Sequence, residues 1–114
     1  MSSESAMTWE VDVRTVEAMR RSGEAFLLLD CREPDEYATV HIDRALLLPM
    51  SEIAGRLDEF SAYREQPIVV HCHHGGRSLR VARWLREQGF ARAQSMSGGI
   101  DQWAVEIDST LARY

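Results

Sequence analysis

One cysteine lies among residue types that together could perform nucleophilic chemistry. Cys72 belongs to the segment His71-Cys72-His73-His74-Gly75-Gly76-Arg77-Ser78. A short apolar run over 67–71 precedes it and a helical pattern follows it. The segment is therefore expected to be a loop at the carboxyl end of a strand, where open α/β sheets bind ligands.

The residues around Cys72 favour its ionised form. Gly75 and Gly76 let the backbone curl so that several N–H groups point inward. A helix beginning near Arg77 adds the positive end of its dipole, and the Arg77 guanidinium can hold an oxyanion through two hydrogen bonds. Because such surroundings lower the pKa of a thiol, the sequence predicts a thiolate nucleophile inside a cradle for a small anion.

Other interpretations of this loop stay open. Cys72 could be a buried, inert residue, with glycines that serve only the turn. The adjacent histidines could bind a metal, but adjacent ligands rarely converge on one ion, so no metal and no cofactor is predicted. His71 ends a strand and is expected to pack there, whereas His73 and His74 are interpreted as rim residues that tune charge and donor access.

Composition narrows the class of protein. The chain has 114 residues, of which 45% are apolar, enough for one domain with a core. A net charge of -5 argues against nucleic-acid binding, no apolar run is long enough to span a membrane, and the N-terminus has no secretory pattern. We predict a flexible segment over 1–7, one domain over 8–114, and a cytoplasmic location.

Short apolar runs alternate with helical patterns, which predicts an α/β domain with a mostly parallel sheet. The strands are expected at 26–29, 45–48, 67–71 and 91–96. The helices are expected after a cap at Asp12 to Met19, near 34–37, over 53–60, from the loop to Gly89, and over 100–105. Residues 106–114 have no clear pattern.

Three segments, in the same order, resemble the signatures of the rhodanese family. The loop Cys72–Ser78 resembles the active-site loop of that family. Asp30-Cys31-Arg32-Glu33-Pro34-Asp35-Glu36-Tyr37, followed by His41-Ile42-Asp43-Arg44-Ala45 and Pro49, resembles its N-terminal signature. Ser97-Gly98-Gly99-Ile100-Asp101-Gln102-Trp103 resembles its C-terminal signature. Val40 and Arg44 stand where the family usually has glycine, which predicts altered turns there.

The resemblance implies a single rhodanese-like domain, a five-stranded parallel sheet flanked by helices on both faces. It also implies a thiosulfate sulfurtransferase-like enzyme. Cys72 would take sulfur from a small anionic donor such as thiosulfate, release sulfite, and pass the sulfur to a thiol, cyanide or protein acceptor. Cys72 and Arg77 are the predicted catalytic residues. The predicted substrate-binding residues are His73, His74, Gly75, Gly76 and Ser78.

Two rival functions share these residues. Cysteine phosphatases, including those with a rhodanese fold, and arsenate reductases resemble a His-Cys pair followed by five residues and an arginine. Only four residues separate Cys72 from Arg77, and this shorter loop is predicted to cradle sulfur better than a phosphoryl group. A relay or binding module that works only with a protein sulfur donor also stays open.

Residues outside the loop receive mainly structural interpretations. Asp30 and Arg32 follow a buried strand and could support the loop, but anchoring of backbone turns is favoured. His41 is expected to hydrogen-bond a turn. Cys31 shares a strand face with Leu27 and Leu29, so a packed core cysteine is favoured over a resolving thiol for Cys72.

Overall fold

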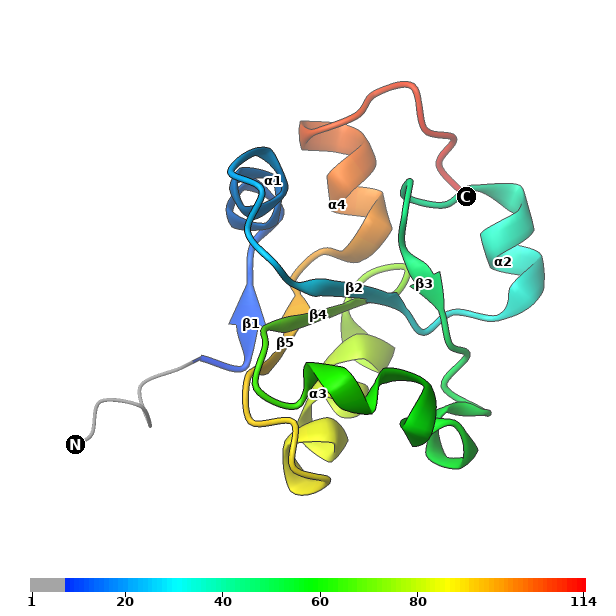
Figure 1. The fold of residues 1–114 in the computed structure, drawn as a ribbon. Coiled ribbons are helices and arrows are strands. Elements are labelled where there is room, and N and C mark those ends of the chain that lie inside the picture. The colour runs from blue at the N-terminus through cyan, green and yellow to red at the C-terminus, as the bar shows by residue number, and fades with distance from the viewer. Residues whose placement is uncertain (1–7) are drawn as a thin grey trace.

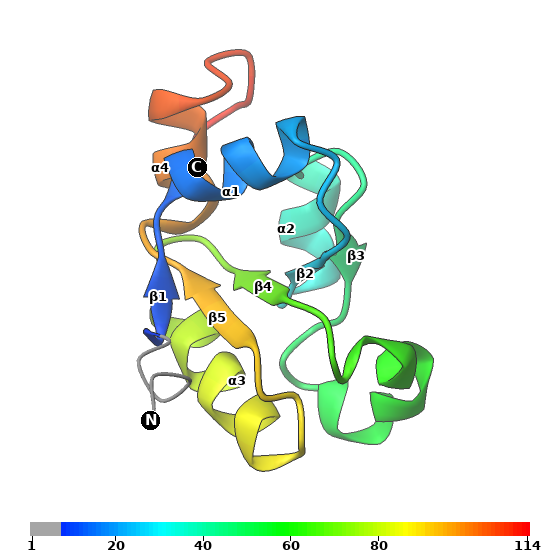
Figure 2. The same ribbon diagram turned by 60° about the vertical axis from the view of Figure 1, so that its left-hand side comes forward.

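The computed structural model describes residues 8–114, in which helices cover both faces of a parallel sheet (Figures 1 and 2). The strand order is β1-β5-β4-β2-β3, and every neighbouring pair is parallel. The strands are β1 (Glu10–Val11), β2 (Leu27–Asp30), β3 (Leu46–Leu47), β4 (Ile68–His71) and β5 (Ala93–Met96). The predicted five-stranded parallel sheet is confirmed.

The central strands β2 and β4 are buried on both faces, as their unbroken apolar runs predict. Leu28 and Val69 face one core cluster, whereas Leu29 and Val70 face the other. The first cluster is covered by α1 (Val13–Arg21) and α4 (Gly99–Glu106). The second is covered by α3 (Gly76–Glu87) and the short 3₁₀ helices η2 (Ile53–Gly55) and η3 (Leu57–Tyr63). The prediction of helices on both faces is confirmed.

The remaining helix, α2 (Pro34–Thr39), follows β2 and lies beside β3 and the C-terminal segment (Figure 1). It begins with a capping box in which Glu33 and Glu36 exchange side-chain and backbone hydrogen bonds. Glu36 is thereby fixed at the start of a helix that comes directly after the central strand β2. This position brings its carboxylate to the edge of the sheet where the loop lies.

Local sequence signals predicted most elements but missed two features. Asp12 caps α1 as expected, accepting a hydrogen bond from the Thr15 N–H at 2.8 Å. β1 was missed because its two residues are too few to show a pattern. The expected helix over 53–60 is wrong, since that segment forms two 3₁₀ helices that bury Ile53 and Phe60.

Arg44, at one of the two departures from the family pattern, has a φ of 69°. Its backbone therefore keeps the left-handed conformation that glycine adopts without strain. Val40, at the other departure, is extended and buried. The predicted flexible segment 1–7 lies outside the described residues, and within 8–114 we find no helix long and apolar enough to cross a membrane.

Candidate active site

The loop after β4 wraps around the sulfur of Cys72. The Cys72 Sγ accepts hydrogen bonds from the backbone N–H groups of Gly75, at 3.1 Å, and Ser78, at 3.3 Å. Gly75 is the N-cap of α3 with a φ of 118°, a conformation that a side chain would strain. The sulfur is thus placed at the N-terminus of α3, where unpaired N–H groups and the helix dipole stabilise a negative charge.

These surroundings lower the pKa of Cys72 from 9.0 to about 4. The largest contribution comes from the neighbouring Cys31 side chain, followed by hydrogen bonds from Ser78 and Gly75, against the opposing effect of burial. The Ser78 hydroxyl lies 3.4 Å from Sγ and 2.7 Å from the hydroxyl of Ser95, which can keep it oriented. Cys72 is therefore held as a thiolate at neutral pH.

We expect Ser78→Ala to raise the pKa of Cys72, by about one unit, because it removes a hydrogen bond that only the thiolate needs. The measurement is a pH titration of thiolate absorbance in the ultraviolet. The wild-type midpoint should lie at about 4 and the variant midpoint above it. Ser61→Ala, at an exposed hydroxyl remote in sequence from the loop, is the matched control. Equal midpoints in all three proteins would contradict the assignment.

The start of α4 holds the other side of the loop. The backbone N–H groups of Ile100 and Asp101 donate to the carbonyl oxygens of Cys72, at 2.9 Å, and His73, at 3.1 Å. This close approach requires a glycine at position 99, where an added Cβ would lie 2.4 Å from the His73 oxygen and 2.5 Å from the Cys72 oxygen. The Ser97-Gly98-Gly99 turn therefore holds the backbone of the loop in place.

Gly99→Ala is accordingly expected to push the loop out of place. Its φ of 60° and the backbone contacts predict a loss of about 1–3 kcal/mol in the free energy of unfolding. Displacement of Cys72 should also lower the rate of any reaction at its sulfur about tenfold or more. Chemical denaturation and turnover assays measure both effects. Gly55→Ala, where the new Cβ meets nothing within 4 Å, should change neither, and similar behaviour of the two variants would contradict this role.

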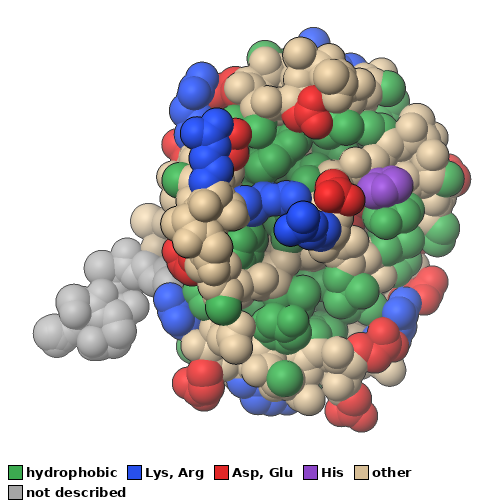
Figure 3. Space-filling view, turned by 45° about the horizontal axis from the view of Figure 1, so that its top comes forward, with side chains coloured by type: hydrophobic (Ala, Val, Ile, Leu, Met, Phe, Trp, Pro, Cys, Tyr) green, Lys and Arg blue, Asp and Glu red, His purple; other side chains and the backbone are tan. Residues whose placement is uncertain are grey.

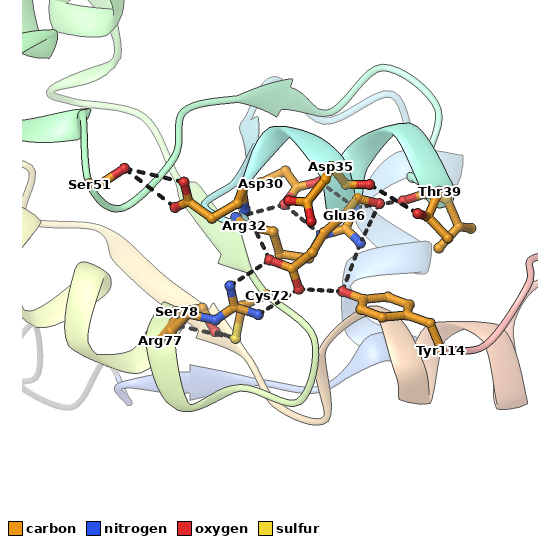
Figure 4. Close-up of polar contacts among 12 residues, drawn as sticks. Asp30, Arg32, Asp35, Glu36, Thr39, Ser51, Cys72, Arg77, Ser78 and Tyr114 are labelled. Carbon is orange, nitrogen blue, oxygen red and sulfur yellow. Dashed lines mark hydrogen bonds and ion pairs between the residues drawn. The ribbon is translucent and has the colours of Figure 1, made fainter.

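An ionic cluster lies beside the sulfur. Figure 4 shows the Arg77 guanidinium next to Cys72 and facing Glu36, with Tyr114 on the far side of that carboxylate. Arg77 donates two hydrogen bonds to Glu36, at 2.7 and 2.9 Å, and the Tyr114 hydroxyl donates a third at 2.9 Å. The Arg77 guanidinium is the main cause that lowers the pKa of Glu36 to about 2. Arg77 is thus near the nucleophile but already paired.

A buried ion pair braces the end of β2. Arg32 donates to both carboxylate oxygens of Asp30, at 2.9 and 2.7 Å, and neither side chain is exposed. Arg32 also donates to the carbonyl oxygen of Val40 at 2.7 Å and to the Tyr114 hydroxyl at 2.9 Å. These contacts tie α2 and the C-terminal segment to the sheet, which favours the structural interpretation of Asp30 and Arg32.

Comparison with known proteins agrees with this arrangement. A family model described as a Rhodanese-like domain matches residues 12–106. The chain belongs to the rhodanese family. It is 35% identical over 98 residues to a protein named sulfurtransferase from Allochromatium vinosum, covering 86% of this chain and 90% of that one. It is also 40% identical over 79 residues to the thiosulfate sulfurtransferase GlpE of Coxiella burnetii, covering 68% and 70%.

A solved structure gives the same result for the rhodanese fold. The human single-domain sulfurtransferase TSTD1 superposes with a TM-score of 0.73 and 25% identity, covering 87% of this chain and 97% of that one. The predictions of a rhodanese family member and of a thiosulfate sulfurtransferase-like enzyme are confirmed. The roles assigned to individual residues of the loop remain predictions.

The histidines of this rhodanese domain differ in their surroundings. His71 is fully buried, and burial lowers its pKa. The His73 ring stacks on the rings of Tyr114 and His74, with centroids 3.8 and 3.9 Å apart, and His74 is itself largely exposed. His41 lies at the end of α2, where its Nδ1 is 3.0 Å from the Tyr37 carbonyl oxygen, in line with the predicted structural role. Among residues 8–114 no His, Cys, Asp or Glu cluster could hold a metal ion.

A groove of about 480 Å³ lies apart from the rhodanese loop, lined mainly by α1, α4 and the residues after them. Figure 3 shows the molecule with the top of Figure 1 turned forward. On this face, hydrophobic side chains lie beside arginine, acidic and histidine side chains. Arg20 and Arg21 line the groove together with Glu17, Asp43 and Asp108. No cysteine or serine lines the groove, and its charges are mixed.

Sequence reasoning missed two residues of the ionic cluster. Glu36 lies 41 residues before Arg77 in the chain, and Tyr114 belongs to the segment that shows no clear pattern. The sequence shows the acidic signature around Glu36, but nothing in that signature predicts that Glu36 pairs with Arg77. Cys31 packs in the core as expected. Its effect on the pKa of Cys72, however, emerges only from the pairing of β2 with β4.

Proposed function

We propose that this protein transfers a sulfane sulfur from a donor to a thiophilic acceptor through a persulfide on Cys72. The observation that carries the proposal is the Cys72 thiolate. Its sulfur accepts hydrogen bonds from the backbone N–H groups of Gly75 and Ser78 at the start of α3. A thiolate is the reactive form of cysteine, and the same N–H groups would stabilise a persulfide anion. The sulfurtransferase names of the relatives support the same reaction class.

The proposed reaction has two displacements. The Cys72 thiolate attacks the outer sulfur of thiosulfate, a Sγ–S bond forms, and the sulfur–sulfur bond of the donor breaks as sulfite leaves with the electron pair. Cyanide or a thiolate then attacks the terminal sulfur of the persulfide. The Sγ–S bond breaks, thiocyanate or a new persulfide is released, and the Cys72 thiolate is restored.

The pairing of Arg77 with Glu36 modifies the expected binding of the donor. Arg77 is predicted to hold an oxyanion, which in thiosulfate would be the sulfonate end, but two of its N–H donors already point to a carboxylate. A dianionic donor would have to displace or tolerate the negative charge of Glu36. We therefore propose that thiosulfate binds weakly and that a thiol-bound persulfide, on a small molecule or a partner protein, is the better donor.

Glu36→Gln is expected to lower the KM for thiosulfate about tenfold, because it removes a charge and leaves Arg77 more available to a sulfonate. Steady-state formation of thiocyanate measures this change. Asp35→Asn removes the same charge from an exposed residue of the same helix and should leave the KM nearly unchanged. If both variants alter the KM equally, net charge alone governs binding and the role given to Glu36 is wrong.

The experiment that tests the proposed function compares donors and substrates in one protein preparation. We expect thiocyanate from thiosulfate and cyanide, and faster transfer from a persulfide donor to a thiol. Transfer only from a protein persulfide would favour a relay module. Hydrolysis of an aryl phosphate without any sulfur transfer would reject the proposal in favour of a phosphatase. Both described cysteines are free, which fits the reducing cytoplasm that we propose as its location.

A further inference from the structure

Cys31, the other cysteine of the chain, lies directly beside Cys72. Cys31 follows β2 and Cys72 follows β4, and these strands pair in parallel with Asp30 opposite His71. The Cys31 N–H donates to the His71 carbonyl oxygen at 3.1 Å, so the pairing continues one residue past the strands. Both side chains belong to the same core cluster, with exposed fractions of 0% for Cys31 and 1% for Cys72.

Of the two thiols, Cys72 ionises and Cys31 stays protonated, because each changes the pKa of the other. Cys31 is the largest single contributor to the low pKa of Cys72, and the neighbouring Cys72 side chain together with burial raises the pKa of Cys31. The resting pair is therefore a Cys72 thiolate beside a protonated Cys31 thiol. Neighbouring strands lie about 4.7–4.9 Å apart, a spacing within the Cα separation of about 4.4–6.8 Å that a disulfide requires.

We propose that Cys31 is a resolving thiol, which displaces the sulfur of a Cys72 persulfide as hydrogen sulfide and leaves a Cys31–Cys72 disulfide. This inference rests on the proposed function, because the persulfide is its substrate. The Cys31 sulfur attacks the Cys72 Sγ, the bond from Sγ to the terminal sulfur breaks, and that sulfur leaves with the electron pair. It takes up the proton that Cys31 releases. The terminal sulfur is reduced and Cys31 is oxidised, so no external oxidant is needed.

Formation of the persulfide itself prepares Cys31 for this step. In the persulfide the negative charge moves from Sγ to the terminal sulfur, toward the N–H groups of the loop. The charge on Sγ, which is the largest of the causes that raise the pKa of Cys31, is then removed, and burial and Asp30 are the causes that continue to raise it. Cys31 is fully buried in the same core cluster as Cys72, so the Cys72 persulfide is the electrophile that the structure places beside it. An enzyme without an acceptor would thus discharge its sulfur and stop in the disulfide form until a thiol reduces it.

The test follows one anaerobic sample of the full chain over time. The protein is loaded with thiosulfate, freed of excess donor, and examined by intact mass and by sulfide capture. We expect the wild type to gain one sulfur atom, then lose it together with two hydrogen atoms, releasing one equivalent of sulfide. In Cys31→Ala the adduct should live at least about tenfold longer, with no disulfide formed. An adduct of equal lifetime in both proteins would overturn the inference and leave the proposed function standing.

Two controls keep the outcomes separate. Cys31→Ser preserves a hydrogen-bond donor of similar size, so it covers the case in which the alanine variant folds poorly. If thiosulfate and a small-molecule persulfide both fail to load Cys72, the proposed function fails, and the cysteine pair is then tested with diamide, an oxidant of thiols. Diamide should link Cys31 to Cys72 in peptide maps of the wild type. Absence of that link would also overturn the inference.

Discussion

Cys72→Ser is expected to reduce thiocyanate formation from thiosulfate and cyanide by about a thousandfold or more, because the variant lacks the thiolate that receives the sulfur. The serine hydroxyl is far less acidic and cannot form a persulfide. The loop should keep its conformation, since a hydroxyl oxygen can still accept hydrogen bonds from the backbone N–H groups of Gly75 and Ser78. Steady-state rates, with the melting temperature as a check on folding, measure the effect. Residual activity near that of the wild type would remove Cys72 from the mechanism.

Asp30→Ala is expected to have the largest effect on stability, a loss of about 3–5 kcal/mol in the free energy of unfolding. The substitution leaves the Arg32 guanidinium buried without its carboxylate, and neither side chain of the pair reaches solvent. A loss of this size is a large part of the stability of an ordinary domain. Urea denaturation measures it.

Two further variants isolate the cause of that loss. Replacement of both partners, Asp30→Leu with Arg32→Met, should cost less than Asp30→Ala, because no unpaired charge remains in the core. Glu59→Gln removes one partner of the exposed Arg56–Glu59 pair and should leave the free energy of unfolding nearly unchanged. If the double variant is the least stable of the three, lost packing and not an orphaned charge explains the effect.

The parts of the fold that sequence could predict are those with local signals. Apolar runs such as 67–71 mark strands that are buried on both faces, and Asp12 marks the start of a helix. The loop was equally visible, because Gly75 is required by the left-handed turn and Cys72 stands three residues before it, directly after the apolar run. Residue types at short spacing therefore located the loop and the cysteine that we propose as the nucleophile.

The parts that sequence could not predict depend on pairings between distant segments. Arg77 pairs with Glu36 because α2 lies at the edge of the sheet next to the loop. No sequence pattern near Glu36 predicts that contact. Tyr114 reaches the same carboxylate from a segment without helix or strand. The contact between Cys31 and Cys72 depends on the register of β2 against β4. Each of these is a tertiary contact between segments that lie far apart in the chain.

The most direct test of the central claim is the mass of the protein after brief exposure to a sulfur donor, measured for the wild type and for Cys31→Ala. Thiosulfate or a small-molecule persulfide should add one sulfur atom, peptide mapping should place it on Cys72, and cyanide should remove it as thiocyanate. Cys72→Ala should gain nothing. If neither donor adds sulfur to the wild type or to Cys31→Ala, or if the sulfur lies on another residue, Cys72 is not the carrier and the proposed sulfurtransferase mechanism is wrong.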